Sequence, residues 1–464
     1  MKQADSVKSP SNTGALLFIL CLASSLVPFM GSALNLALPY IDKDLTLNTV
    51  MLGWIPTSYM LSTAILQIPC ARFADMVGRK KVFVWGVAIL SVFSVLSGLA
   101  TTGVTLIVYR FLAGIGSAMM FGTSTAILTS SVPAEKRGWA MGIISASVYF
   151  SLAAGPFIGG LLTQYLDWHS IFFVSAAISF IVAVGGYYII KEDWKEDTKS
   201  KFDTIGSVLF AIGLSALIYG FTTLPHIQGF ICIGVGIVVL LIFVFYEKKQ
   251  EFPVFNIRVF LENKIFRLSS LSALINYSAT FAISFMLSLY LQNVRGLTPR
   301  DAGLLLIIQS VVQAIASLKS GSLSDKMSPT YLATIGMSII AVGLIGLCFI
   351  SEDTSYYFLG GMLILLGLGF GIFSSPNANI IMSSVEKKYY GLASATMGTM
   401  RLTGQSLSMG IAIMSISLMV GNINMSAMPP TKFISSMQIT FIICLILCLF
   451  GIYASSVRGK KEKG

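Results

Sequence analysis

Long apolar runs separated by short polar breaks are the feature that most constrains this chain. Each run is expected to cross a membrane as a helix, because a bilayer core about 30 Å thick takes roughly 20 apolar residues. With 55% hydrophobic and only 11% charged residues, the 464-residue sequence needs lipid as its solvent. The runs of spanning length lie at 14–38, 50–70, 82–101, 104–128, 139–162, 169–190, 206–223, 228–246, 266–292, 302–320, 331–350, 357–383, 391–420 and 435–456. They predict an all-α polytopic membrane protein with about 14 transmembrane helices.

The basic residues gather on alternate loops. One side holds the two termini and most loop bases, among them Arg79, Lys80, Lys81, Lys136, Arg137, Lys248, Lys249, Lys387 and Lys388. The opposite loops hold only Lys43, Arg295, Arg300 and Lys432. Basic loops are retained in the cytoplasm during insertion, so we expect a multi-pass protein of the cell membrane with cytoplasmic N- and C-termini. The net charge of +11 then reports topology, and no nucleic-acid partner is expected.

The chain divides into two similar halves. Ala71–Asp75 resembles Gly321–Asp325, and Gly138 begins a stretch that resembles the one at Gly391, each pair about 250 residues apart. Two long polar stretches bracket the seventh and eighth runs. We therefore predict an N-terminal six-helix bundle at 1–190, a linker with two inserted helices at 191–264, and a C-terminal six-helix bundle with a basic tail at 265–464. Parallel repeats of this kind are typical of alternating-access transporters.

The loop after the second run places Asp75 three residues before Gly78-Arg79-Lys80. This spacing resembles the signature of the major facilitator superfamily, with Ala71 in place of its first glycine. The resemblance implies the major-facilitator fold, with two extra helices here. Asp75 can accept from a helix N-terminus or an arginine of the other bundle, so we expect a conformational latch formed by Asp75, Gly78, Arg79, Lys80 and the repeat's Asp325. The alternative is that the bases are topology anchors only.

Arg110 lies a few residues into the fourth run. Charge within lipid costs at least a few kcal/mol, so this side chain is expected to face the protein interior. It resembles the superfamily's fourth-helix arginine, which is implicated in proton coupling, and is therefore a coupling candidate. The alternative is an arginine that extends to the nearby membrane surface.

The fifth run contains Gly155-Pro156-Phe-Ile-Gly159-Gly160. This pattern resembles the antiporter motif of the superfamily's exporters, while close packing of small residues is the alternative interpretation. Further stretches, including Asn35-Leu-Ala-Leu-Pro39, resemble the fourteen-helix drug:proton antiporter branch. The resemblance thus implies multidrug-type efflux driven by protons.

The polar residues within the runs are uncharged or basic. Every Asp and Glu lies in a loop, a terminus or a helix end, and Met30 stands where the branch usually has an Asp. The candidates for the substrate cavity are Asn35, Gln67, Asn276, Tyr277, Gln309, Gln313, Asn377, Arg401 and Gln405. Each uncharged one can instead hydrogen-bond between helices. Arg401 would suit an anionic or zwitterionic substrate, unless it pairs with a helix C-terminus.

These features predict a secondary active transporter that exports drug-like or amphipathic organic solutes by alternating access, with proton antiport implied by the resemblance. The alternative is a same-fold carrier of a specific metabolite, anionic for example, without proton coupling through a membrane carboxylate. The only histidines, His169 and His226, lie in separate loops, so neither an enzyme nor a metal or cofactor site is expected. The expected partners are a small-molecule substrate, protons and the lipid bilayer, and we expect a monomer.

Overall fold

The computed structural model describes residues 13–132, 137–195, 202–251, 253–324, 326–386, 389–420 and 429–457. Within these ranges, 14 helices are long and apolar enough to cross a membrane, which confirms the expected fold class. The first six are α1 (Thr13–Leu45), α2 (Thr49–Val77), α3 (Arg79–Gly98), α4 (Gly103–Ser131), α5 (Arg137–Tyr165) and α6 (His169–Ile189).

The inserted helices and the second half follow in the expected order. The inserted pair is α7 (Thr204–Thr223) and α8 (Ile227–Glu247), and a short helix that the sequence did not predict, α9 (Ile257–Glu262), lies in the polar stretch after it. Six residues are too few for a recognisable helical period. The last six spans are α10 (Lys264–Leu289), continued by a π-turn η2 (Tyr290–Val294), α11 (Pro299–Leu323), α12 (Pro329–Leu347), α13 (Tyr356–Ser383), α14 (Tyr390–Val420) and α15 (Pro430–Val457).

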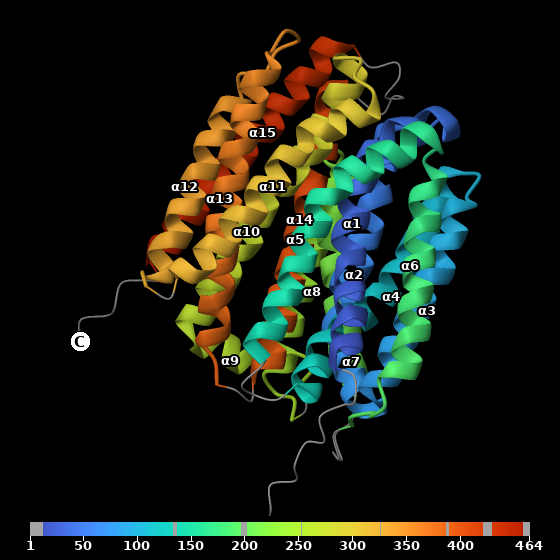
Figure 1. Cartoon of the computed structure of the whole chain (residues 1–464). Helices are drawn as coiled ribbons and strands as arrows, with labels where there is room; N and C mark the ends of the chain where they lie inside the picture. Colours follow the sequence, from blue (N-terminus) through green and yellow to red (C-terminus); the bar gives the residue numbers. More distant parts are fainter. Residues whose placement is uncertain are drawn as a thin grey trace, which may run out of the picture.

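The spans form two bundles, α1–α6 and α10–α15, that lean against each other (Figure 1). We call the side on which α1 begins and α15 ends the terminal side, and the opposite one the distal side. Side chains with N-capping oxygens fix where several helices start. Asn48 accepts from the backbone N–H of Met51 at 2.8 Å at the distal start of α2. Asn263 does the same for Phe266 at 2.9 Å at the terminal start of α10.

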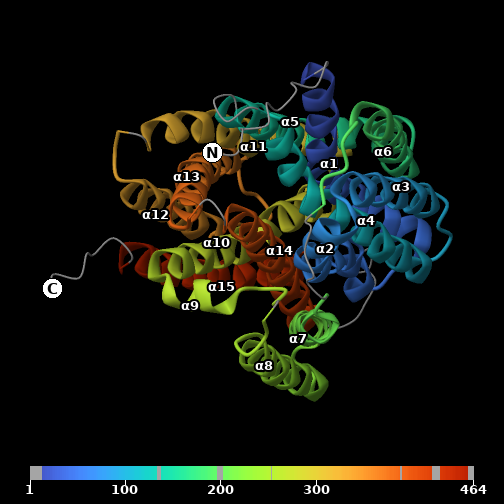
Figure 2. The ribbon, with the colours of Figure 1, turned by 90° about the horizontal axis from the view of Figure 1, so that it is seen from below.

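The inserted pair packs over one of the two seams between the bundles. Seen from below in Figure 2, α7 lies against α2 and α14, and α8 lies outside it. The ring centroids of Trp54 on α2 and Tyr219 on α7 are 6.0 Å apart. Farther along, one apolar cluster joins all three helices: Leu61, Ala64, Ile65, Leu214, Ile218 and Leu402. The pair therefore touches both bundles and covers the α2–α14 seam on its outer side.

Glycines let α7 and α8 approach each other closely. A Cβ at Gly236 would lie 2.7 Å from the backbone nitrogen of Leu217, and one at Gly220 would lie 2.8 Å from the carbonyl oxygen of Gly229. Close approach of backbones is the usual way in which helices associate in lipid, where burial of apolar surface supplies little driving force. In contrast, a Cβ added at Gly234, two residues before Gly236, would have no atom within 4 Å.

We predict that Gly236→Val separates α7 from α8 and lowers stability by about 1–3 kcal/mol, the usual cost of overpacking. Gly234→Val is the matched control, since its side chain would meet nothing within 4 Å. The apparent Tm of the purified protein in detergent measures the effect. Equal Tm values for the two variants would contradict the packing described here.

Candidate substrate site and gate between the bundles

The two bundles touch at their distal ends. The Ser288 hydroxyl on α10 donates to the backbone oxygen of Asn35 on α1 at 2.7 Å, and the Gln292 amide donates to the backbone oxygen of Leu36 at 3.2 Å. The backbone N–H of Arg300 donates to Gln164 Oε1 at 3.3 Å. These bonds link α1 to α10 and α5 to α11. The two bundles are thus in direct contact at their distal ends, and we call these contacts the distal gate.

The glycines of the fifth-helix motif lie at close helix contacts, and one of them, Gly160, lies at this gate. A Cβ at Gly159 would lie 2.6 Å from Ala33 of α1, and one at Gly160 would lie 2.6 Å from the carbonyl oxygen of Pro299 in the other bundle. A Cβ at Gly303 of α11 would lie 2.5 Å from the carbonyl oxygen of Pro156. Gly155 faces Ser32 of α1. The motif therefore packs α5 against α1 on one face and against α11 on the other.

Arg401 on α14 is connected to aromatic side chains of both bundles. Its guanidinium lies over the ring of Phe121 on α4, with 5.9 Å to the centroid. Tyr277 on α10 lies within electrostatic reach of Arg401 and of Tyr149 on α5. The ring of Tyr277 is in turn 5.6 Å from that of Phe370 on α13. Among the described residues, no carboxylate lies within 4.0 Å of Arg401. We call these five residues the central cluster.

The other cavity candidates occupy different places. The Asn377 amide donates to the backbone oxygen of Ser269 at 3.2 Å, so it joins α13 to α10 within one bundle. The amide of Gln67 on α2 faces Gly398 of α14, where a Cβ would lie 2.3 Å from Nε2. Asn35 lies at the distal gate. Gln309 is buried where α11 packs on α13, while Gln313 and Gln405 are half-buried and no hydrogen bond is described for either side chain.

Asn276 is the most isolated polar side chain of the second bundle. It is fully buried on α10, and neither atom of its amide receives or donates a hydrogen bond within the described part of the chain. The hydroxyls of Ser272 on α10 and Ser406 on α14 are also buried, and neither has a hydrogen-bond partner among the described residues. Buried polar groups normally find a partner, often an ordered water or a ligand. Buried polar atoms without a described partner thus occur on both α10 and α14.

Arg110 is 1% exposed and lies inside the first bundle, which excludes extension to the membrane surface. Its guanidinium lies over the ring of Tyr59 on α2 at 4.2 Å, and the ring of Phe172 on α6 is 5.7 Å away. The Tyr59 hydroxyl is in turn 2.5 Å from the Ser117 hydroxyl. Two aromatic faces therefore stabilise the buried charge, which matches the expectation that it faces the interior.

The signature loop holds itself together on the terminal side. Asp75 Oδ1 accepts from Arg79 Nε at 2.8 Å, and Arg79 donates to Ser130 of α4 at 3.1 Å. Gly78 has φ of +128°, a conformation that a side chain would strain. Arg79 begins α3, and Lys80 is its second residue. Asp325, the proposed counterpart in the repeat, lies outside the described residues.

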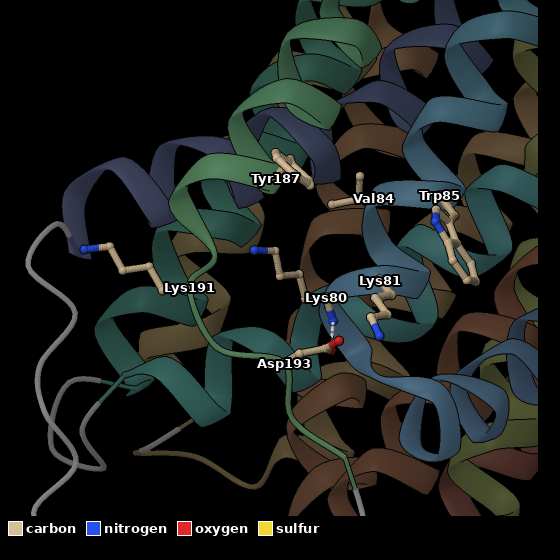
Figure 3. A pocket seen from close by; sticks show the side chains of 7 residues that line it. All are labelled: Lys80, Lys81, Val84, Trp85, Tyr187, Lys191 and Asp193. Carbon is tan, nitrogen blue, oxygen red and sulfur yellow. Dashed lines mark hydrogen bonds between the residues drawn. The ribbon is translucent and has the colours of Figure 1, made fainter.

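The segment that follows α6 contacts the start of α3. The N–H of Arg79 donates to the carbonyl oxygen of Trp194 at 3.1 Å, and the N–H of Lys80 donates to Asp193 Oδ1 at 3.0 Å. Figure 3 draws the second of these bonds. Asp193 therefore caps the N-terminus of α3.

Sequence reasoning missed a carboxyl pair at the terminal ends of the inserted helices. Glu247 is 2% exposed, and its Oε1 lies 2.4 Å from the point that a Cβ on Gly206 would occupy. Asp203 Oδ2 lies 2.4 Å from the same point, so the two oxygens lie within twice that distance of each other. Neither oxygen receives a hydrogen bond from any described donor. Little in the sequence indicated this pair, because both residues are at helix ends, where a carboxylate is usually exposed to solvent.

The comparisons with known proteins agree on one family. The model of the Major Facilitator Superfamily matches residues 20–409. "Riboflavin transporter RibZ" of Clostridioides difficile (strain 630) is 27% identical, with 86% of this chain and 87% of that protein covered. "Multidrug resistance protein Stp" of Mycobacterium tuberculosis (strain CDC 1551 / Oshkosh) is 28% identical, with 86% and 74% covered. A crystal structure of a bacterial homologue of the human lysosomal transporter Spinster, inward-facing and unoccupied, has a TM-score of 0.67 at 19% identity and covers 99% of this chain and 100% of its own.

We predict that Gly303→Val opens the distal gate, because the new side chain would overlap the carbonyl oxygen of Pro156. Gly361→Val is the control, since nothing lies within 4 Å of that position. Spin labels are placed at Thr101 and Asp353, on exposed distal loops of the two bundles. Pulsed electron paramagnetic resonance then measures the distance between the labels, which increases when the gate opens. In a cysteine-free background the Gly303 variant shifts the distance distribution to longer values. An unchanged distribution would show that this contact does not hold the gate closed.

Proposed function

Because the chain belongs to the Major Facilitator Superfamily, whose members are membrane transporters rather than enzymes, we propose that it exports drug-like, amphipathic organic solutes by alternating access. The central cluster carries this proposal. Phe121 and Tyr149 come from the first bundle and Tyr277, Phe370 and Arg401 from the second, so a solute bound among them would touch both halves. A solute in that position is released when the halves rock apart on the other side.

The chemistry of the cluster favours flat aromatic solutes that are neutral or negatively charged. Aromatic faces bind planar rings by offset stacking and edge contacts. Arg401 has no described carboxylate near it, so it repels a cation and attracts an anion or a polar carbonyl. The second candidate function, a carrier for a specific anionic metabolite, rests on the same arginine. Relatives of this chain are named as a multidrug resistance protein and as a transporter of one specific solute, riboflavin.

The orientation that we propose places the terminal side in the cytoplasm of a cell-membrane protein that works as a monomer. The sidedness of the basic loops supports it. The distal gate is then the closure on the outside, and we propose that the state with this gate closed loads substrate from the cytoplasm. In the outward-facing state, we propose, Asp75 leaves Arg79 and closes the terminal side as a latch with Gly78, Lys80 and Asp325.

We propose that protons drive this export. Two sites support coupling in the described part of the chain. Arg110 lies buried against Tyr59, where its charge responds to rearrangement of α2, α4 and α6. In the Asp203–Glu247 pair, one buried oxygen of each carboxyl group has no hydrogen-bond donor among the described residues. A proton shared between the two carboxyl groups would provide the missing donor. The Tyr246 hydroxyl donates to Asp203 Oδ1 at 3.2 Å, and the N–H of Phe255 faces Glu247 Oε2 at 3.4 Å.

Arg401→Ala tests the substrate chemistry. With the base removed, we expect transport of an anionic planar dye in proteoliposomes to fall about tenfold or more, since loss of a charge contact between the half-buried Arg401 and the dye should cost at least about 1.4 kcal/mol. Arg401→Lys keeps the charge but not the planar fork and should restore it only in part. Lys319→Ala, at an exposed residue of α11, is the control. Robust efflux of a cationic dye that is indifferent to Arg401 would refute the anion preference, and no movement of any solute would refute export itself.

Glu247→Gln tests the proton pair. An amide cannot release the shared proton, so we expect accumulation driven by a pH gradient to be lost while substrate counterflow without a gradient continues. Glu262→Gln is the matched control on the same side, because Glu262 is exposed on α9. Normal gradient-driven accumulation in the Glu247 variant would exclude this pair as the coupling site and leave Arg110 as the candidate.

A further inference from the structure

One face of α10 carries three polar side chains that are fully buried. Ser269, Ser272 and Asn276 are spaced by three and four residues, so they lie on the same side of the helix. Each of the three is 0% exposed. The two hydroxyl oxygens and both polar atoms of the Asn276 amide have no hydrogen-bond partner in the described part of the chain.

Other hydroxyls of α10 bond to the backbone of their own helix. The Ser278 hydroxyl donates to the carbonyl oxygen of Leu274 at 2.8 Å, and the Thr280 hydroxyl donates to that of Asn276 at 2.7 Å. Any serine within a helix can bond to the preceding turn in this way. Ser269 and Ser272 do not, so their hydroxyls are turned away from the backbone of α10.

The helix α13 packs against α10 through contacts at two levels. The Asn377 amide donates to the backbone oxygen of Ser269 at 3.2 Å, and the rings of Phe370 and Tyr277 are 5.6 Å apart. The two helices run in opposite directions, because the earlier residue of α10 meets the later residue of α13. The stretch 269–277, about 12 Å long, therefore lies beside the stretch 370–377.

Ser374 is the polar residue of α13 between these two contacts. It lies four residues after Phe370 and three before Asn377, so it shares their side of the helix. Its hydroxyl oxygen is buried and has no partner among the described residues. Ser374 and Ser272 are each about 4.5 Å along the helix axis from the Ser269–Asn377 contact, and so lie at the same height. The Asn276 side chain leans toward Ser272, because side chains on a helix point to its N-terminus.

We propose that an ordered water molecule is bound between α10 and α13, among the Asn276 amide and the hydroxyls of Ser272 and Ser374. The amide offers a donor and an acceptor and each hydroxyl offers both, so the three groups supply the roughly three hydrogen bonds of a buried water. The small side chain of Ala273, which is also buried, leaves room on the same side of α10. The water links the two helices directly beside Tyr277 and Phe370 of the central cluster.

A polar group of the exported solute is the competing occupant, since Tyr277 and Phe370 also belong to the central cluster. The burial of the site favours water. Ser272 and Asn276 have no exposed surface, and the Ser269–Asn377 and Tyr277–Phe370 contacts bound the site along the helices. A single water fits within such bounds, whereas a solute would have to separate α10 from α13.

A structure of the full chain in lipid nanodiscs, at a resolution that shows waters, tests the proposal. We expect a water peak about 2.7–3.2 Å from the Asn276 amide and from Ser374 Oγ, both without solute and with an anionic planar dye. Solute density in place of the peak, or no peak in the dye-free protein, would overturn the proposal. The dye-free structure makes this result independent of whether the protein exports such dyes.

A double-variant cycle tests the link between the helices. Asn276→Ala and Ser374→Ala should each lower the apparent Tm, and the double variant should lose less than the sum, because either change already removes the water. The control pairs Asn276→Ala with Ser415→Ala. Ser415 is buried on α14, about 16 Å along the helix from Gly404 opposite Tyr277, and donates to its own helix at 2.8 Å. The control losses should add. Additive losses for Asn276 and Ser374 would show that no water joins them.

Discussion

The bilayer core offers no water to the backbone, and this constraint determines most of the structure. Each span must satisfy its own N–H and C=O groups, so it is a helix, and polar side chains turn inward on it. Many hydroxyls donate to a carbonyl of the preceding turn, such as Thr63 to Tyr59 at 2.7 Å and Thr280 to Asn276 at 2.7 Å. What then holds the helices together is close approach at small residues, because lipid tails are as apolar as leucine.

Close approach at glycine also explains how the bundles can part. At the distal gate α5 and α11 meet at Gly160 and Gly303, each of which faces a backbone carbonyl, and the side chains of Ser288, Gln292 and Gln164 add hydrogen bonds to backbone groups of the other bundle. Separating the bundles breaks these hydrogen bonds and glycine contacts. Charged residues stay out of this seam and gather at the terminal side, in the signature loop and around the start of α3. Close packing is thus the main interaction on the distal side, and interactions of charged residues are the main ones on the terminal side.

The sequence could predict where along each span a residue lies, but not which side chains it contacts. Run length identified all 14 spans, although α1 and α2 extend seven residues beyond the expected ends at 38 and 70. The cost of a charge in lipid correctly predicted that Arg110 faces the protein interior. The cavity candidates shared only a position within the apolar runs, and the structure places them at different sites. Asn377 donates a hydrogen bond within its own bundle, and Asn35 lies at the distal gate. The central cluster needed Phe121, Tyr149 and Phe370, which no periodicity distinguishes from core aromatics. Asp193 at the start of α3 and Glu247 beside Asp203 are long-range contacts that local patterns do not encode.

The central claim is that one solute site between the bundles is opened to either side in turn, with the distal gate as one of the two closures. Cysteines at Leu36 and Gln292 of an otherwise cysteine-free chain, joined by a short bis-maleimide, would fix this gate shut. The account predicts that purified protein in proteoliposomes then stops moving its aromatic solute across the bilayer but still binds it. Transport that continues at the uncrosslinked rate would contradict alternating access through this gate.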